Sequence, residues 1–129
     1  SLAGSNSSSL VEAIDLFPTL VELNGWNKPK HCQGRSLLDV LRNPHHKVRD
    51  AAFSTTRKAN LVRTEQYAYI RYAKNEEELY DMKSDPLQLT NLADRKESQS
   101  VLKKLRGLLD KHLIRVAKET PAQIHNEIK

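Results

Sequence analysis

The apolar residues near the start of the chain recur at the spacing of an amphipathic helix. A first set stands three or four positions apart: Leu10, Ile14, Phe17 and Val21. The string Ser9–Glu12 has the spacing of a capping box, which predicts a helix start there. However, an interior Pro18 would cost about 3 kcal/mol, so we expect the helix proper to begin near Asp15, with Asp15 as its cap and Pro18 in its first turn. Asn24-Gly25 predicts its end after Leu23.

The middle of the chain changes to short apolar runs separated by turn residues. A short helix is predicted over Leu37–Leu41, with Ser36 as its N-cap. Four runs then predict strands: Ala51–Thr55, Leu61–Thr64, Tyr67–Tyr72 and Leu79–Met82. The second and third runs are separated only by Glu65-Gln66, and the third alternates between two faces, as is typical of an antiparallel hairpin. We expect the fourth run to join the same sheet.

The longest helical pattern runs from Ser98 to about Ala117. Its apolar stripe is formed by Leu102, Leu105, Leu109, Leu113 and Val116. Such a stripe is the side that a surface helix buries. We therefore expect the four leucines to pack on the sheet, and Lys103, Arg106 and Lys111 to lie in water.

Composition adds a size and a charge to this picture. The chain has 129 residues, the size of one domain, and a formal net charge of +5. That charge favours anionic partners such as nucleic acid, anionic lipid or sulfated glycans, although a well-solvated surface is the simpler explanation. The single cysteine, Cys32, excludes an internal disulfide, and no apolar run approaches the ~20 residues of a membrane span.

The ends of the chain differ in composition from its middle. Residues 1–9 are small, polar and uncharged, which predicts a flexible tag or boundary rather than a signal peptide. We expect the folded domain over residues 10–117 and a loose tail over residues 118–129.

Four strings of residues, in order along the chain, resemble motifs of type I sulfatases. The longest, Glu78–Ala93, is similar to the family's ELYDL-x-DP-x-E-x-x-NLA string, with Met82 in place of Leu and Gln88 in place of Glu. The others are Asp15–Leu20 followed by Gly25, then Gln33–Leu38, then Val62–Ile70. The resemblance covers about Leu10–Leu113, so the chain resembles the C-terminal subdomain of a type I sulfatase, of a kind similar to iduronate-2-sulfatase.

The resemblance implies a fold and an activity. The fold is α+β, a small antiparallel sheet of about four strands with a C-terminal helix packed on it, within an alkaline-phosphatase-like enzyme. The parent enzyme would be a sulfuric ester hydrolase that uses a formylglycine and a divalent cation, which we expect to be calcium. The chain would then be a fragment that buttresses the catalytic domain of the same polypeptide and helps to wall the cleft for a sulfated substrate such as a glycan. By the same resemblance we expect the parent in the periplasm, secreted or in the lysosome.

No catalytic or metal-binding residue is predicted within this chain, and so no cofactor. The family makes its formylglycine from the first residue of a C/S-x-P/A-x-R motif. Cys32–Arg35 departs from that motif, since Gly34 replaces Pro or Ala and Arg35 is one residue too close. His31 beside Cys32 supplies two ligands, fewer than a zinc site needs. We therefore expect the fragment alone to be inactive, with its catalytic machinery upstream.

Two basic pairs are candidates for binding an anionic substrate: Arg57 with Lys58, and His45 with His46. Arg57 and Lys58 follow a predicted strand in a loop, where binding residues concentrate. In sulfatases similar to iduronate-2-sulfatase, the corresponding loop lies at the edge of the active-site cleft. A solvated loop explains Arg57 and Lys58 at least as well, and adjacent loop histidines are more often simply solvated.

Two other functions stay open. A free-standing basic module would bind nucleic acid or another polyanion through its net charge and the lysines of the last helix. Mixed charges and the lack of an RNA-binding signature disfavour nucleic acid, and no membrane partner is expected. The other alternative is an interaction domain without chemistry of its own.

Overall fold

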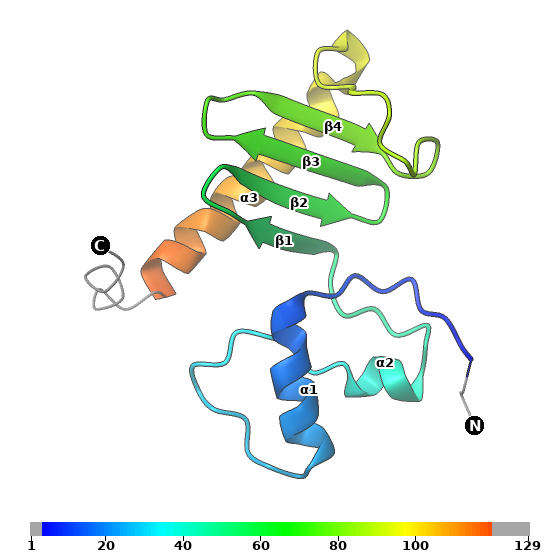
Figure 1. The fold of residues 1–129 in the computed structure, drawn as a ribbon, viewed down its shortest axis with the longest axis vertical. Coiled ribbons are helices and arrows are strands. Elements are labelled where there is room, and N and C mark those ends of the chain that lie inside the picture. The colour runs from blue at the N-terminus through cyan, green and yellow to red at the C-terminus, as the bar shows by residue number, and fades with distance from the viewer. Residues whose placement is uncertain (1–3, 120–129) are drawn as a thin grey trace. The chain divides into compact units, whose positions relative to one another are not determined.

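A computed structural model describes residues 4–119 of the chain (Figure 1). They form two compact units, the N-terminal unit (residues 4–52 and 63–65) and the sheet unit (residues 53–62 and 66–119). Residues 1–3 of the predicted boundary lie outside the described residues, as do residues 120–129 of the predicted tail. The first two residues of that predicted tail, Lys118 and Glu119, belong to the last helix.

The N-terminal unit is built on two helices and a preceding 3-10 turn: η1 (Ala13–Asp15), α1 (Leu16–Leu23) and α2 (Leu38–Arg42). The predicted bounds of α1 are confirmed, because the helix begins directly after Asp15 and has Asn24 as its C-cap. Gly25 follows with φ +69°, a conformation that favours glycine at a helix exit. Helix α2 begins one residue later than predicted, and the Ser36 hydroxyl accepts a hydrogen bond from the Leu38 N–H at 3.2 Å.

The capping box predicted for Ser9–Glu12 is wrong. The Ser9 hydroxyl instead accepts a hydrogen bond from the backbone N–H of Val48, at 2.9 Å. The box lies three residues further on, where the Glu12 N–H donates to the Asp15 carboxylate at 2.8 Å around η1. Sequence spacing favoured the earlier position because a serine is a common N-cap, but a partner distant in sequence competes for that hydroxyl.

Four strands form one sheet: β1 (Ala51–Thr55), β2 (Ala59–Thr64), β3 (Tyr67–Tyr72) and β4 (Glu77–Asp81). Their spatial order is β1-β2-β3-β4. Strands β3 and β4 pair antiparallel, with Tyr69 opposite Leu79 and Arg71 opposite Glu77. The predicted hairpin and the addition of the fourth strand are confirmed.

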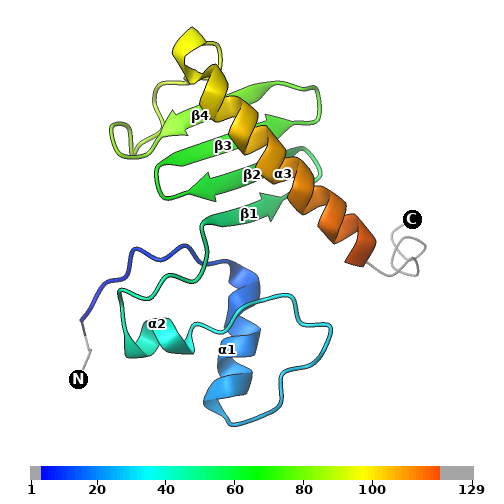
Figure 2. The same cartoon turned by 180° about the vertical axis from the view of Figure 1, so that it is seen from behind.

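Helix α3 (Gln99–Glu119), preceded by the 3-10 turn η2 (Lys96–Ser98), crosses one face of the sheet (Figure 2). The buried core of the sheet unit includes Val62, Tyr69, Leu79, Leu102, Leu105 and Leu109. Leu113, also expected in the core, is only half-buried, whereas Lys103 and Lys111 are exposed as expected. The predicted α+β fold, an antiparallel sheet with a C-terminal helix packed on it, is confirmed.

The prediction that Arg106 lies in water is met only in part, because its side chain is 41% exposed but also bound to a strand. Its Nε donates to the Glu77 carboxylate at 2.8 Å, and Glu77 also accepts the hydroxyl of Tyr69. Burial and the neighbouring Glu77 raise the pKa of Tyr69 to about 12, and the hydrogen bond from Arg106 holds the pKa of Glu77 below its ordinary value. A second ion pair joins Arg71 to Asp110 at 2.8 Å. These contacts fix α3 on β3 and β4, and helical periodicity does not reveal them because the partners lie on strands.

Candidate functional site

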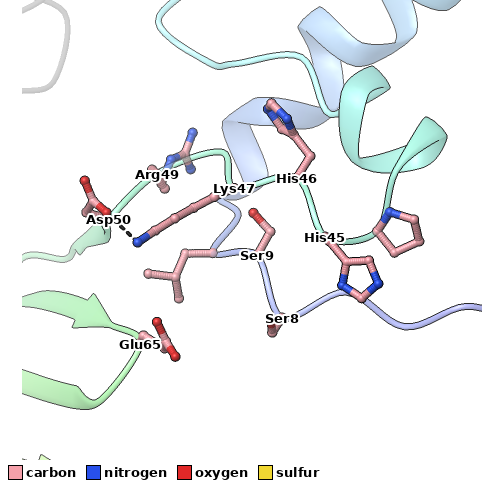
Figure 3. A pocket seen from close by; sticks show the side chains of 10 residues that line it. Ser8, Ser9, His45, His46, Lys47, Arg49, Asp50 and Glu65 are labelled. Carbon is pink, nitrogen blue, oxygen red and sulfur yellow. Dashed lines mark ion pairs between the residues drawn. The ribbon is translucent and has the colours of Figure 1, made fainter.

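His45 and His46, two of the predicted substrate-binding residues, line a pocket in the N-terminal unit (Figure 3). The pocket has a volume of about 150 Å³. The remaining lining residues are Ser8, Ser9, Leu10, Pro44, Lys47, Arg49, Asp50 and Glu65. One wall is held in place because the Ser7 hydroxyl donates to the Pro44 carbonyl oxygen at 2.6 Å.

The charged residues of this pocket are largely paired with carboxylates of the N-terminal unit. Lys47 Nζ lies 2.6 Å from an oxygen of Asp50, and this contact raises the pKa of Lys47 and lowers that of Asp50. Arg49 is engaged with carboxylates of the same unit, and Glu65 adds a further negative charge. The pocket therefore suits a small polar group better than a strongly anionic one. A role for His45 and His46 in binding an anion stays a prediction.

Arg57 and Lys58, the other predicted pair, form the tip of the β1–β2 turn in the sheet unit. The turn is closed by the Thr56 N–H, which donates to the Ala59 carbonyl oxygen at 2.8 Å. Both basic side chains are exposed, as expected for a loop. Their part in substrate binding also stays a prediction.

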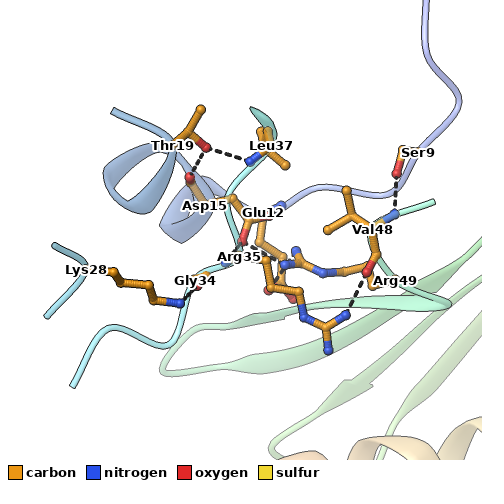
Figure 4. A network of polar contacts seen from close by, with 10 residues as sticks. All are labelled: Ser9, Glu12, Asp15, Thr19, Lys28, Gly34, Arg35, Leu37, Val48 and Arg49. Carbon is orange, nitrogen blue, oxygen red and sulfur yellow. Dashed lines mark hydrogen bonds and ion pairs between the residues drawn. The ribbon is translucent and has the colours of Figure 1, made fainter. Parts of the chain in front are cut away.

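The most extensive polar network is centred on Asp15, a residue that the sequence analysis treated only as a helix cap (Figure 4). Its side chain is fully buried. It accepts hydrogen bonds from the backbone N–H groups of Glu12 and Arg35, both at 2.8 Å, and from Arg49 Nη2 at 2.7 Å. Burial alone would raise the pKa of Asp15, but these hydrogen bonds, above all that from Arg49, outweigh it and hold the pKa below its ordinary value. Arg49 Nη1 lies 2.9 Å from Glu12, so the guanidinium joins two carboxylates.

The same network joins two of the motifs that carry the family resemblance. Thr19 donates to the Asp15 carbonyl oxygen at 2.6 Å and accepts a hydrogen bond from the Leu37 N–H at 2.9 Å. Arg35 Nη1 donates to the Val48 carbonyl oxygen at 2.6 Å. Asp15–Leu20 and Gln33–Leu38 are therefore two sides of one structural clamp, in which side chains of the first motif bind backbone N–H groups of the second.

Gly34 completes the clamp through its lack of a side chain. A Cβ at this position would lie 2.0 Å from the carbonyl oxygen of Ile14 and 3.1 Å from Pro18 Cγ. The first distance is far inside van der Waals contact, and its partner is backbone. Only glycine lets the two segments approach this closely.

We expect Gly34→Ala to lower the free energy of unfolding of the N-terminal unit by about 1–3 kcal/mol or more, the range for overpacking. Gly107→Ala is the matched control, since a Cβ there meets no atom within 4 Å. Gly107 lies inside α3, so its replacement should stabilise the helix by up to about 1 kcal/mol. Thermal unfolding of both variants tests whether Gly34→Ala lowers the stability while Gly107→Ala raises it. If Gly34→Ala leaves the stability unchanged, the close approach of the two segments is contradicted.

The described residues do not fit a formylglycine or a divalent cation. Among residues 4–119, no group of three or more His, Cys, Asp or Glu side chains is arranged to hold a metal ion. Cys32 is a free, half-buried thiol in a loop, where its N–H donates to the Pro29 carbonyl oxygen at 3.1 Å.

No helix within residues 4–119 has the length and apolar character needed to cross a membrane.

Comparison with known families gives a match over most of the chain. Residues 2–115 match the family described as N-sulphoglucosamine sulphohydrolase, C-terminal.

Curated relatives are much longer than this chain. A sulfatase of Formosa agariphila is 31% identical over 109 residues, which cover 84% of this chain and 22% of the relative. A delta 4,5-hexuronate-2-O-sulfatase of Bacteroides thetaiotaomicron is 35% identical over 113 residues, which cover 79% of this chain and 23% of the relative. The chain thus spans less than a quarter of the length of these two proteins.

A solved structure shares the fold. It is a protein in complex with its substrate D-glucosamine-2-N,6-O-disulfate, and it superposes with a TM-score of 0.81 at 28% sequence identity. The match covers 92% of this chain and 27% of that protein.

Proposed function

Since the chain belongs to the family of N-sulphoglucosamine sulphohydrolase C-terminal domains, we propose that it serves as the C-terminal subdomain of a sulfatase. In this proposal it packs against the catalytic part of the same polypeptide and helps to wall the substrate cleft of an alkaline-phosphatase-like enzyme. The whole protein hydrolyses a sulfate ester. The formylglycine and the divalent cation, for which we propose calcium, belong to the part of the polypeptide outside this chain.

The observation that carries the proposal is the set of large apolar side chains that α1 exposes. Its inner side is buried through Pro18, Thr19 and Val21. Its outer side exposes large apolar side chains: Leu16, Phe17, Leu20 and Leu23, followed by Trp26 just after the helix. Large apolar side chains gathered on one exposed surface mark an interaction site.

The occupant that we propose for this outer side is the catalytic part of the same polypeptide. In the two curated relatives, more than three quarters of the protein lies outside the region that matches this chain. A covalently connected domain is present at high effective concentration, so a single helix face is sufficient as a contact.

The test uses a polypeptide extended upstream to the length of the relatives. Leu20→Glu places an unpaired charge in the proposed interface, which is costly, and should abolish most of the soluble sulfatase activity. Ile114→Glu is the matched control, because Ile114 is 56% exposed and Leu20 is 59% exposed. Equal activity of the two variants would contradict docking through α1.

The same preparation tests the assignment of the chemistry. The 129-residue chain alone should not hydrolyse an aryl sulfate above a heat-killed control, whereas the extended polypeptide should. The extension should also carry a C/S-x-P/A-x-R motif. Turnover by the chain alone would overturn this assignment.

We propose a sulfated glycan as the substrate, of the iduronate-2-sulfatase-like kind. The support is the hexuronate-2-O-sulfatase among the relatives and the disulfated glucosamine bound by the structural relative. Arg57, Lys58, His45 and His46 are the residues of this chain that we propose to approach it. Product analysis with 2-O- and 6-O-sulfated disaccharides tests whether the enzyme removes the sulfate at position 2 or the sulfate at position 6 of the sugar.

We propose a periplasmic, secreted or lysosomal location for the whole protein. This rests on the family alone. Fractionation of cells that express the extended polypeptide tests it, and a cytosolic pool of active enzyme would contradict it.

A further inference from the structure

We propose that two neighbouring hairpin turns of the sheet unit form a docking surface for a sulfated polysaccharide chain. The surface, which we call the cationic tip, consists of Arg57 and Lys58 in the β1–β2 turn and Lys74 in the β3–β4 turn. The choice of a sulfated polymer rests on the proposed function. The surface itself rests on the geometry and charge of the three residues.

The two turns lie side by side at one end of the sheet. In an antiparallel sheet of order β1-β2-β3-β4, the first and third connections meet at the same end, and both views show them there (Figures 1 and 2). The Ala73 N–H donates to the Lys58 carbonyl oxygen at 2.9 Å, which joins the turns directly. Residues 57, 58 and 74 therefore share one surface, although 16 positions separate Lys58 from Lys74 in the sequence.

Local hydrogen bonds fix the shape of both turns. The Thr56 hydroxyl accepts from the N–H groups of Lys58 at 3.2 Å and of Ala59 at 3.0 Å. In the other turn, the Tyr72 N–H donates to the Glu76 carbonyl oxygen at 2.9 Å, and Asn75 takes the left-handed φ of 63°. Little backbone entropy would be lost when a ligand binds such preformed turns.

The cations of the tip are not neutralised by ion pairs. Within residues 4–119, the three arginines of the sheet unit that form ion pairs are Arg71, Arg106 and Arg115. No ion pair in that range involves the tip, whose three basic side chains are all exposed. Glu76 is the one carboxylate within the two turns, so the tip keeps an excess of positive charge.

Several other cations of the sheet unit lie close to carboxylates in the sequence. Lys83 stands between Asp81 and Asp85 in the sequence, and Asp94 and Glu97 flank Arg95-Lys96. Lys103 and Lys104 are adjacent on α3, but neighbouring positions of a helix do not share a face. The tip is therefore a place where exposed cations from two different segments converge.

A sulfated polymer matches this surface in charge and in length. Sulfate groups stay ionised at neutral pH, and each exposed cation attracts one of them only weakly. Several contacts along one polymer add up, because each contact releases condensed counterions. Hydroxyl groups of Ser54 and Thr55, both exposed beside the tip, suit the hydroxyl groups of a sugar.

The test measures binding of heparin, a highly sulfated polysaccharide, to the purified chain over a range of salt concentrations. The variant Arg57→Gln/Lys58→Gln/Lys74→Gln should bind on the order of tenfold more weakly or worse and show a shallower salt dependence. The matched control Lys83→Gln/Arg95→Gln/Lys96→Gln removes the same residue types and the same charge from other places. It should bind nearly as the unchanged chain does.

Each outcome decides the proposal. Equal losses in both triple variants mean that net charge alone binds heparin, and overturn it. If single-stranded DNA binds through the tip as tightly as heparin does, the proposed partner is a nucleic acid and the choice of a sulfated polymer is overturned. Weaker DNA binding together with loss confined to the tip variant supports the proposal.

Failure of this proposal is distinguishable from failure of the proposed function. Heparin binding needs no formylglycine or cation, so it is measured on the chain alone. A chain that binds heparin through the tip, but whose extended polypeptide lacks the C/S-x-P/A-x-R motif, would overturn the sulfatase assignment and leave the surface in place. If the extended polypeptide is an active sulfatase but the tip variant binds heparin as the unchanged chain does, the proposed surface is overturned and the sulfatase assignment remains.

Discussion

Asp15→Ala is expected to lower the free energy of unfolding of the N-terminal unit by about 3–5 kcal/mol, the usual effect of removing one partner from a buried ion pair. Asp15 is fully buried and its partner Arg49 has a side chain that is only 6% exposed. The substitution leaves the guanidinium with Glu12 alone and orphans the N–H of Arg35, which donates to Asp15. Urea unfolding measures the loss.

A matched control separates this buried pair from ion pairs in general. Lys47 and Asp50 are also in contact, but the side chain of Asp50 is 92% exposed. Asp50→Ala should therefore leave the unfolding transition almost unchanged. Amide hydrogen exchange adds a local readout, because the Arg35 N–H should lose its protection in Asp15→Ala. Equal unfolding curves for the two variants would contradict the clamp.

The same network predicts how stability depends on pH. The hydrogen bonds from Arg49 and two backbone N–H groups outweigh the effect of burial and depress the pKa of Asp15 in the folded state. A group whose pKa is lower when folded stabilises the fold above its unfolded pKa, here an ordinary value of 3.8. That stability is lost as the pH falls through the lower folded value. The unchanged chain should therefore lose more stability than Asp15→Asn between about pH 5 and about pH 2.

The elements of the fold were largely predictable because local pattern specifies them. Pro18 and Gly25 mark the two ends of α1, and the alternation from Tyr67 to Tyr72 specifies a strand. The leucine stripe of α3 specifies which side of the helix packs on the sheet. Each of these signals lies within a few residues of the element it predicts.

The polar contacts were not predictable in the same way, because their partners are distant in sequence. Asp15 and Arg49 are 34 positions apart, and Arg106 and Glu77 are 29 apart. Spacing along α3 placed Arg106 on the solvent side, yet a long side chain reaches back to a strand. Only the folded chain brings these charges together.

The candidate site was also predictable only in part. His45-His46 and Arg57-Lys58 were recognisable as basic pairs in loops, but the sequence did not indicate what surrounds them. The structure adds Asp50 and Glu65 to the pocket of the histidines, and Lys74 to the turn of Arg57 and Lys58. The first addition lowers the attraction of that pocket for an anion, and the second raises the attraction of the turns.

Leu105→Ala is expected to destabilise the sheet unit by about 2–5 kcal/mol, the range for truncating a buried leucine. Leu105 is 2% exposed, in the middle of the side of α3 that faces the sheet. Removing its side chain leaves a cavity beside Leu102 and Leu109, which are buried on the same side of the helix. For a unit of this size, that is a large share of the total stability.

Lys103→Ala is the control on the same helix, since its side chain is exposed. Its stability should stay within about 0.5 kcal/mol of the unchanged chain. The comparison also decides between two roles for α3. If α3 is a core element, Leu105 dominates stability and Lys103 contributes little to any property. If α3 is a nucleic-acid-binding face, Lys103→Ala should weaken DNA binding at unchanged stability. Equal melting temperatures for the two variants would contradict the packing of α3 on the sheet and, with it, the assignment of this unit as a supporting subdomain.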